Sequence, residues 1–110
     1  MAAKYELLKS SDGQYYFNLK AANGQVILTS ERYKEKPSAT NGIDSVKRNS
    51  PDDGRYERKT SAKGQPFFVL KATNGEPIGR SEMYTSKSSM ENGIKSVKTN
   101  GPGAVTSDKS

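Results

Sequence analysis

Four glutamates recur at one fixed spacing and are the first candidates for acid–base chemistry. Glu6 and Glu57 are separated by 57 − 6 = 51 residues, and Glu31 and Glu82 by the same interval. Paired carboxylates act as general acid and base when they lie about 5–9 Å apart in a cleft. Nothing in the sequence brings these carboxylates together. In the alternative interpretation, Glu31 and Glu82 hold strand-to-helix corners together through hydrogen bonds.

The residues on which most enzymes depend are missing. The chain has no histidine and no cysteine, which excludes disulfides, thiolate nucleophiles, zinc sites of sulfur or imidazole, and Ser-His-Asp or Cys-His catalysis. The phosphate loop, the dinucleotide-binding glycine motif and the EF-hand loop are absent, and no serine precedes a lysine by three residues. We therefore predict no catalytic, cofactor-binding or metal-binding residues. An enzyme would have to use Glu, Lys, Tyr or Ser.

A second set of residues has the types needed for binding. Residues 15–21 alternate between apolar and polar side chains, as in a strand with one buried face. Tyr16 and Lys20, with their counterparts Phe67 and Lys71, would then lie on the open side of a sheet. Aromatic rings stack on bases and lysines bind phosphates, so these four are candidate binding residues. Such a face can equally be a protein interface, or be partly covered by neighbouring residues.

The charge balance bears on the choice of partner. The chain has 18 basic and 12 acidic residues, a net charge of +6. Residues 55–110 carry 10 basic and 5 acidic side chains, so most of the excess lies in the second half. A basic excess favours nucleic acid or acidic protein partners, although it can also serve only to keep a small domain soluble. We predict a cytoplasmic location and no membrane partner, because neither an apolar span nor a secretory signal is seen.

The fixed interval reflects an internal duplication. About half of the roughly fifty positions in the two copies are identical without gaps, and such a period indicates a repeated structural unit. We place repeat one at about 4–53 and repeat two at about 55–104. The two would form a single domain over residues 1–103, followed by a flexible C-terminal tail at 104–110, although residues 104–106 could add a short strand.

Local patterns predict the same elements in each copy. The strands of copy one are predicted at residues 4–9, 15–21 and 25–30, and the third strand of copy two at residues 76–81. Asn23-Gly24 and Asn74-Gly75 predict type I′ hairpin turns, because both residue types tolerate positive φ.

Apolar residues at i, i+4 and i+7 predict one helix in each copy. The helices are predicted over residues 36–49 and 87–100. Gly42 and Gly93 lie inside them, which indicates either close approach of helix and sheet or simple inheritance through duplication. Tyr33 and Tyr84 precede the helices, and we interpret both as half-buried anchors. Strand–strand–strand–helix, repeated twice, predicts an α+β fold in which the repeats share one mainly antiparallel sheet with both helices on one face.

These motifs resemble the YegP-like family of small bacterial proteins. The segments that carry the resemblance are Phe17-x-Leu19-Lys20-Ala21-x-Asn23-Gly24, Ser30-Glu31-x-Tyr33 and Asn41-Gly42-Ile43-x-Ser45-Val46-Lys47. The resemblance covers both copies and leaves out only the tail beyond Gly101. It implies β-β-β-α-β units paired in one sheet, with C-terminal strands exchanged, so that the segment around Tyr56 would bridge the copies. The family has no assigned activity, substrate or cofactor, so no functional residue carries over.

The sequence thus favours a small non-enzymatic binding module, with a preference for an anionic partner. Two alternatives stay open: a structural protein acting through strand-exchanged association, and an enzyme without His or Cys. We expect a monomer with an internal pseudo-two-fold.

Overall fold

The computed structural model describes residues 2–110, which form seven strands and two α-helices. In chain order the elements are β1 (Lys4–Lys9), β2 (Tyr15–Lys20), β3 (Val26–Ser30), α1 (Lys36–Asn49), a short 3₁₀ helix (Asp53–Arg55), β4 (Tyr56–Thr60), β5 (Pro66–Lys71), β6 (Pro77–Arg80), α2 (Lys87–Asn100) and β7 (Val105–Asp108). Both α-helices have the predicted bounds, and the predicted strands agree to within one residue at each end. Local sequence patterns therefore determine these elements well.

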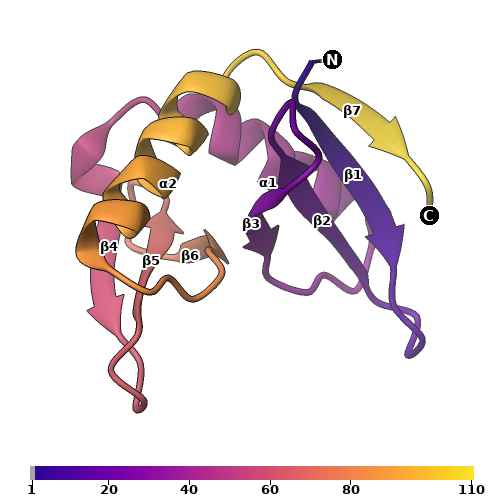
Figure 1. Ribbon diagram of the computed structural model, residues 1–110. Coiled ribbons are helices and arrows are strands. Elements are labelled where there is room, and N and C mark those ends of the chain that lie inside the picture. The colour runs from indigo at the N-terminus through magenta and orange to yellow at the C-terminus, as the bar shows by residue number, and fades with distance from the viewer. Residues whose placement is uncertain (1) are drawn as a thin grey trace.

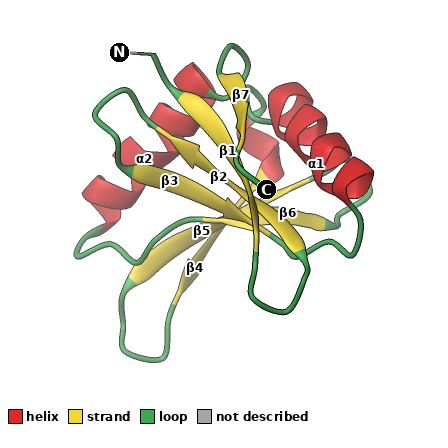
Figure 2. Ribbon diagram, turned by 90° about the vertical axis from the view of Figure 1, so that its right-hand side faces the viewer, coloured by secondary structure: helices red, strands yellow, loops and turns green. Residues whose placement is uncertain are grey.

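The strands of both copies form one continuous sheet in the order β4-β5-β6-β3-β2-β1-β7. Neighbouring strands are antiparallel, except that β7 runs parallel to β1. The two helices lie on the same side of the sheet, and both chain ends lie at its β7 end (Figure 1; Figure 2). In the described residues no helix covers the opposite side, which we call the open face. The predicted α+β architecture is confirmed.

A single apolar core lies between the helices and the sheet. The side chains of Leu19 and Leu70 are fully buried, as are those of Phe17 and Phe68. The apolar stripes of both helices are buried against them. These stripes are Ala39, Ile43 and Val46 in α1, and Met90, Ile94 and Val97 in α2. Because α1 also contacts β5 and β6, and α2 contacts β3, each helix packs on both copies.

Equivalent residues of the two copies meet where β3 pairs with β6. Thr29 lies opposite Arg80, and 80 − 29 = 51 is the repeat interval, so a pseudo-two-fold axis passes between them. On the core side the axis separates Leu28 from its counterpart Gly79. A Cβ on Gly79 would lie 2.7 Å from the Thr29 carbonyl oxygen and 3.2 Å from the Leu28 side chain. A second leucine, at position 79, would clash with Leu28 and with the Thr29 carbonyl. This explains why the two copies carry different residues at this position.

The repeated helix glycine is explained by close approach of a tyrosine. A Cβ on Gly42 would lie 2.6 Å from the Tyr33 hydroxyl oxygen, and a Cβ on Gly93 would overlap the Tyr84 hydroxyl. Both tyrosines are half-buried, as predicted. Of the two explanations left open by the sequence, the structure supports close packing over inheritance alone.

The first tyrosine of each copy caps the helix of the other copy. Tyr5 on β1 donates a hydrogen bond of 2.7 Å to the Gly101 carbonyl oxygen at the end of α2. Tyr56 on β4 donates a bond of the same length to the Ser50 carbonyl oxygen at the end of α1. The last carbonyls of a helix lack donors within that helix. Each copy therefore supplies a hydrogen-bond donor to the helix end of the other copy. The segment around Tyr56 therefore bridges the copies.

The hairpin turns differ from the predicted type I′. Such a turn needs positive φ at both central residues, whereas in the described residues only glycines, such as Gly24, have positive φ. The Gly24 amide donates to the Ala21 carbonyl, and the Asn23 side chain accepts a hydrogen bond from the Gln25 amide. The loop is thus a type I turn followed by a left-handed glycine. Asparagine is used for its side-chain acceptor and not for its backbone freedom.

The C-terminal segment is a strand, where the sequence analysis expected a flexible tail at 104–110. Residues 105–108 form β7, and the Lys109 amide donates to the Leu7 carbonyl oxygen at 2.8 Å. Ion pairs from Lys36 to Asp108 and from Lys109 to Glu6 fasten the strand. The polar segment is ordered because it pairs with the outer edge of β1. The alternative prediction of a short strand at residues 104–106 is therefore correct in part. None of the helices in residues 2–110 is long and apolar enough to cross a membrane.

Candidate functional site: the open face of the sheet

The open face carries an excess of positive charge. Strand alternation, side-chain contacts and the lining of its hollows place seven basic and four acidic side chains there, and 7 − 4 leaves an excess of three, half of the +6 of the whole chain. The acidic residues are Glu6, Glu31, Glu57 and Glu82, and the basic residues are Lys4, Lys20, Arg32, Lys59, Lys71, Arg80 and Lys109. A surface of one prevailing sign attracts ligands of the opposite sign.

All four predicted binding residues lie on this face, in two separate groups. Tyr16 and Lys20 are on β2, and Phe67 and Lys71 are on β5. Because β3 and β6 lie between these strands, the structure brings the residues together within each copy and keeps the two pairs apart.

The copy-one group is already engaged by its neighbours. The Arg32 guanidinium lies over the Tyr16 ring, 4.2 Å from its centre, and Lys20 Nζ is 2.9 Å from Glu6 Oε1. The cation–π contact occupies the ring that a ligand would need. The Lys20–Glu6 ion pair does not distinguish the halves, because Lys71 pairs with Glu57 in the same way in copy two. This half of the face offers little free aromatic surface.

Glu6 is the anchor of the copy-one half. Its side chain is only 7% exposed and lies 2.8 Å from Lys109, 2.9 Å from Lys20 and 3.5 Å from Lys4. Hydrogen bonds from Lys109 and Lys20 lower the pKa of Glu6 to about 2. A carboxylate that stays ionised in this way fixes β7 to β1 and is poorly suited to general acid catalysis.

The copy-two group is more open. Phe67, Val69 and Lys71 line a hollow of about 340 Å³ on the open face. Lys59 lies directly across from Phe67 on β4, and Arg80 lies across from Val69 on β6. The hollow therefore contains a half-buried aromatic ring and cations from three strands.

Glu57 in this hollow is the counterpart of Glu6 but is far more exposed. Its side chain is 43% exposed. The Glu57 Oε1 atom lies 2.8 Å from Lys71 Nζ and 3.6 Å from Lys59 Nζ. The hydrogen bond from Lys71 lowers the pKa of Glu57. The difference in exposure follows from β7, which covers the outer edge of β1, whereas the outer edge of β4 is unpaired in the described residues.

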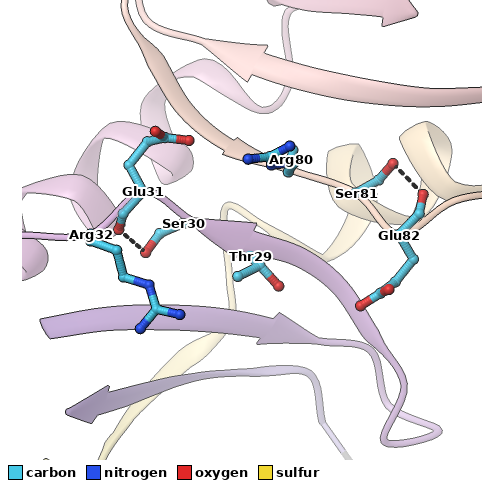
Figure 3. Close-up of a pocket in the computed structure, with 7 residues that line it drawn as sticks. All are labelled: Thr29, Ser30, Glu31, Arg32, Arg80, Ser81 and Glu82. Carbon is cyan, nitrogen blue, oxygen red and sulfur yellow. Dashed lines mark hydrogen bonds between the residues drawn. The ribbon is translucent and has the colours of Figure 1, made fainter. Parts of the chain in front are cut away.

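A second hollow of about 320 Å³ lies on the pseudo-two-fold axis and shares Glu31 and Arg80 with the first. Figure 3 shows Thr29 and Arg80 on facing strands, with Glu31 and Glu82 on either side. Within residues 2–110, Arg80 makes no ion pair. Arg80 is thus a cation at the junction of both hollows that is free to bind an anion.

Serines hold the strand-to-helix corners, where the sequence analysis had suggested glutamates. Ser30 Oγ accepts a hydrogen bond from the Phe17 amide at 2.9 Å and donates one to the Glu31 carbonyl oxygen at 2.7 Å. Ser81 makes the same two bonds in copy two. The side chains of Glu31 and Glu82 line the central hollow instead.

The structure separates one repeated pair of glutamates and brings the other pair into one hollow. Glu6 and Glu57 lie on β1 and β4, which are separated by four strands. Glu31 and Glu82 both line the central hollow, and Glu31 also lines the first hollow together with Glu57. In the part of the chain that the structure describes, no three of His, Cys, Asp or Glu are grouped so as to hold a metal ion.

Sequence reasoning missed Arg80, Lys59 and Arg32 as parts of this surface. The counterpart of Arg80 is the uncharged Thr29, so the repeat gave no signal for it. Lys59 could have been found, because it lies two residues after Glu57 on a strand and therefore points to the same face. Arg32 lies outside the strands, and its place over Tyr16 depends on the tertiary structure.

Comparison with known proteins identifies the family. A family model described as a domain of unknown function (DUF1508) matches twice, at residues 10–57 and 61–108. A UPF0339 protein of Bordetella pertussis is 57% identical over 105 residues, which is 96% of this chain and 95% of the relative. The UPF0339 protein YegP of Escherichia coli is 53% identical over 108 residues and 98% of either chain.

Two solved structures share the fold along the whole chain. The solution NMR structure of E. coli YegP has a TM-score of 0.94 at 52% identity, covering 99% of this chain and 94% of that chain. The solution NMR structure of a UPF0339 protein of Shewanella oneidensis has a TM-score of 0.92 at 50% identity, covering 98% and 92%. The chain therefore belongs to the YegP-like UPF0339 family, as a tandem pair of DUF1508 units.

Proposed function

We propose that this protein is a small, non-enzymatic module that binds an anionic partner in the cytoplasm through the open face of its sheet. The observation that carries the proposal is the excess of three positive charges on that face beside a half-buried aromatic ring, Phe67. Positive charge gathered on one uncovered surface raises the association rate with polyanions. The helices, on the other side, leave this surface accessible.

A comparison of the edge strands speaks against assembly through exchanged strands. Leu7 and Leu8 lie on β1, whose outer edge pairs with β7. Their counterparts are Arg58 and Lys59 on β4, whose outer edge has no partner strand in the described residues. Charged residues on an edge strand oppose pairing with a second sheet. This pattern favours a monomeric binding module.

The test is an amide NMR titration with mixed DNA and RNA oligonucleotides and with heparin, at low and at physiological salt. We expect shifts at Lys71, Arg80 and their neighbours, and binding that weakens steeply with salt because phosphate contacts release counterions. Shifts confined to the helix side, or no shift with any polyanion at low salt, would contradict the proposal.

Matched variants locate the site. Lys71→Gln combined with Arg80→Gln removes two charges from the open face, and Lys87→Gln combined with Lys95→Gln removes two exposed charges from α2. Each lost phosphate contact lowers the slope of log K against log salt by about 1, so the open-face variant should lose about 2. An equal loss in the helix variant would mean that only the net charge matters.

A further inference from the structure

We propose that the copy-two half of the open face binds single-stranded nucleic acid, with a base stacked on Phe67 and phosphates bound by Lys59, Lys71 and Arg80. This inference rests on the proposed function and names the partner and the half of the face that it contacts. Three observations carry it: the half-buried ring of Phe67, over which no cation lies in the described residues, the placement of the cations near it, and the acidic residues beside them.

A cation lies over the aromatic ring in one copy and, in the described residues, not in the other. In copy one the Arg32 guanidinium, a planar group, lies on the Tyr16 ring at 4.2 Å. The counterparts in copy two are Met83 and Phe67, and in the described residues no cation lies over the Phe67 ring. Copy one thus shows that a flat group can stack on a ring at this position. In copy two we assign this role to a base of the ligand.

Three cations lie where the phosphate backbone of a nucleic acid would meet them as it passes this ring. Lys59 and Arg80 lie on the two strands that flank β5. Lys71 lies four residues further along β5 on the same face, roughly 13 Å from Phe67 at the usual rise of a strand. Stacking platforms lined by basic side chains are the usual means of holding single strands, because every base has a flat face.

The acidic residues favour a ligand with bases over one that offers charge alone. Glu31 and Glu57 line the same hollow as Lys59 and Lys71. Their negative charge offsets part of the attraction for any anion, so an acidic peptide would gain little here. A base on Phe67 adds a contact that does not depend on net charge.

The experiment compares three probes of equal formal charge at low salt: an oligothymidylate, an abasic strand of the same length, and an oligoglutamate peptide. We expect the oligothymidylate to bind about 5- to 150-fold more tightly than the abasic strand for each stacked base. Phe67→Leu should remove this preference, and Phe67→Tyr should keep it. Tyr16→Leu is the matched control and should leave the preference intact, because Arg32 already covers that ring. The amide spectrum of each variant checks the fold.

The outcomes separate this inference from the proposed function. Equal binding of the oligothymidylate and the abasic strand would overturn the nucleic-acid inference and leave a general anion-binding module. Tighter binding of oligoglutamate would identify an acidic protein as the partner instead. Equal losses in Tyr16→Leu and Phe67→Leu would overturn the assignment to copy two. Absence of binding by all three probes would overturn both proposals.

Discussion

Tyr5 and Gly101 are 96 residues apart in the sequence and are joined by a buried hydrogen bond of 2.7 Å from the tyrosine hydroxyl to the glycine carbonyl oxygen. Tyr56 makes the equivalent bond to Ser50. Tyr5 of copy one donates to the end of the copy-two helix, and Tyr56 of copy two donates to the end of the copy-one helix. Each helix end therefore depends on a tyrosine of the other copy. We therefore expect the repeats to unfold as one cooperative unit.

Removing either hydroxyl should destabilise both copies at once. Tyr5→Phe leaves the carbonyl oxygen of Gly101 buried without a donor, and we expect the free energy of unfolding to fall by about 1–2 kcal/mol. Tyr56→Phe should act alike on Ser50. Tyr15→Phe is the control, because the Tyr15 hydroxyl makes no hydrogen bond within residues 2–110. Urea unfolding measures the change, and two separate transitions in any variant would refute a shared core.

Alanine at the helix glycines should destabilise the protein, against the usual trend. In an exposed helix, Gly→Ala gains about 1 kcal/mol. At Gly42 the new Cβ would lie 2.6 Å from the Tyr33 hydroxyl oxygen, and we expect a loss of about 1–3 kcal/mol from overpacking. Adding Tyr33→Phe should recover part of this loss. Thermal unfolding of the single and double variants tests the coupling, and a stabilised Gly42→Ala would contradict the packing described here.

Acid should weaken the attachment of β7. Hydrogen bonds from Lys109 and Lys20 lower the pKa of Glu6 from 4.5 to about 2. A group whose pKa is lowered by folding adds stability above its unfolded pKa and loses it as the pH falls. The free energy of unfolding should therefore fall between about pH 4.5 and pH 2.

Glu6→Gln should flatten this pH dependence. We expect it to remove about 1–2 kcal/mol at neutral pH, because solvent screens the partly exposed lysines. Glu57→Gln, at the exposed counterpart, should have a smaller effect. Denaturant unfolding over this pH range, together with amide exchange in β7, makes the measurement. An unchanged pH profile in Glu6→Gln would show that β7 is held by other contacts.

Replacing the charges on β4 should create an association-prone edge. Arg58→Leu combined with Lys59→Leu copies the apolar pair of β1 onto a strand that, within residues 2–110, has no neighbour on its outer side. Unprotected apolar edges pair with other sheets, so we expect concentration-dependent dimers or larger species by light scattering. Arg58 also pairs with Glu91 at 2.6 Å, so Arg58→Gln, which loses this pair without adding apolar surface, serves as the control and should stay monomeric.

The elements of this fold could be predicted because they depend on neighbours in the sequence. The apolar spacing that ends at Val46 and Val97 sets both helices, and the alternation through Leu19 and Leu70 sets the buried faces of β2 and β5. The turn type was predicted wrongly, because Asn23 can serve a turn through its side chain as well as through positive φ. Sequence patterns do not separate these two uses.

The candidate site was predicted in part for the same reason. A period of two is enough to turn Tyr16, Lys20, Phe67 and Lys71 to the open face. Whether each is free depends on residues far away in the chain. Nothing near Lys20 in the sequence shows that Glu6 pairs with it.

By itself, the sequence determined the duplication, the helices, the strands and the direction in which each strand side chain points, since all of these follow from short-range spacing. Only the tertiary structure decided that Thr29 faces Arg80 on the axis, that β7 covers β1, and that β4 stays uncovered. Strand pairing over long sequence separations depends on both partners and on the packing beneath them.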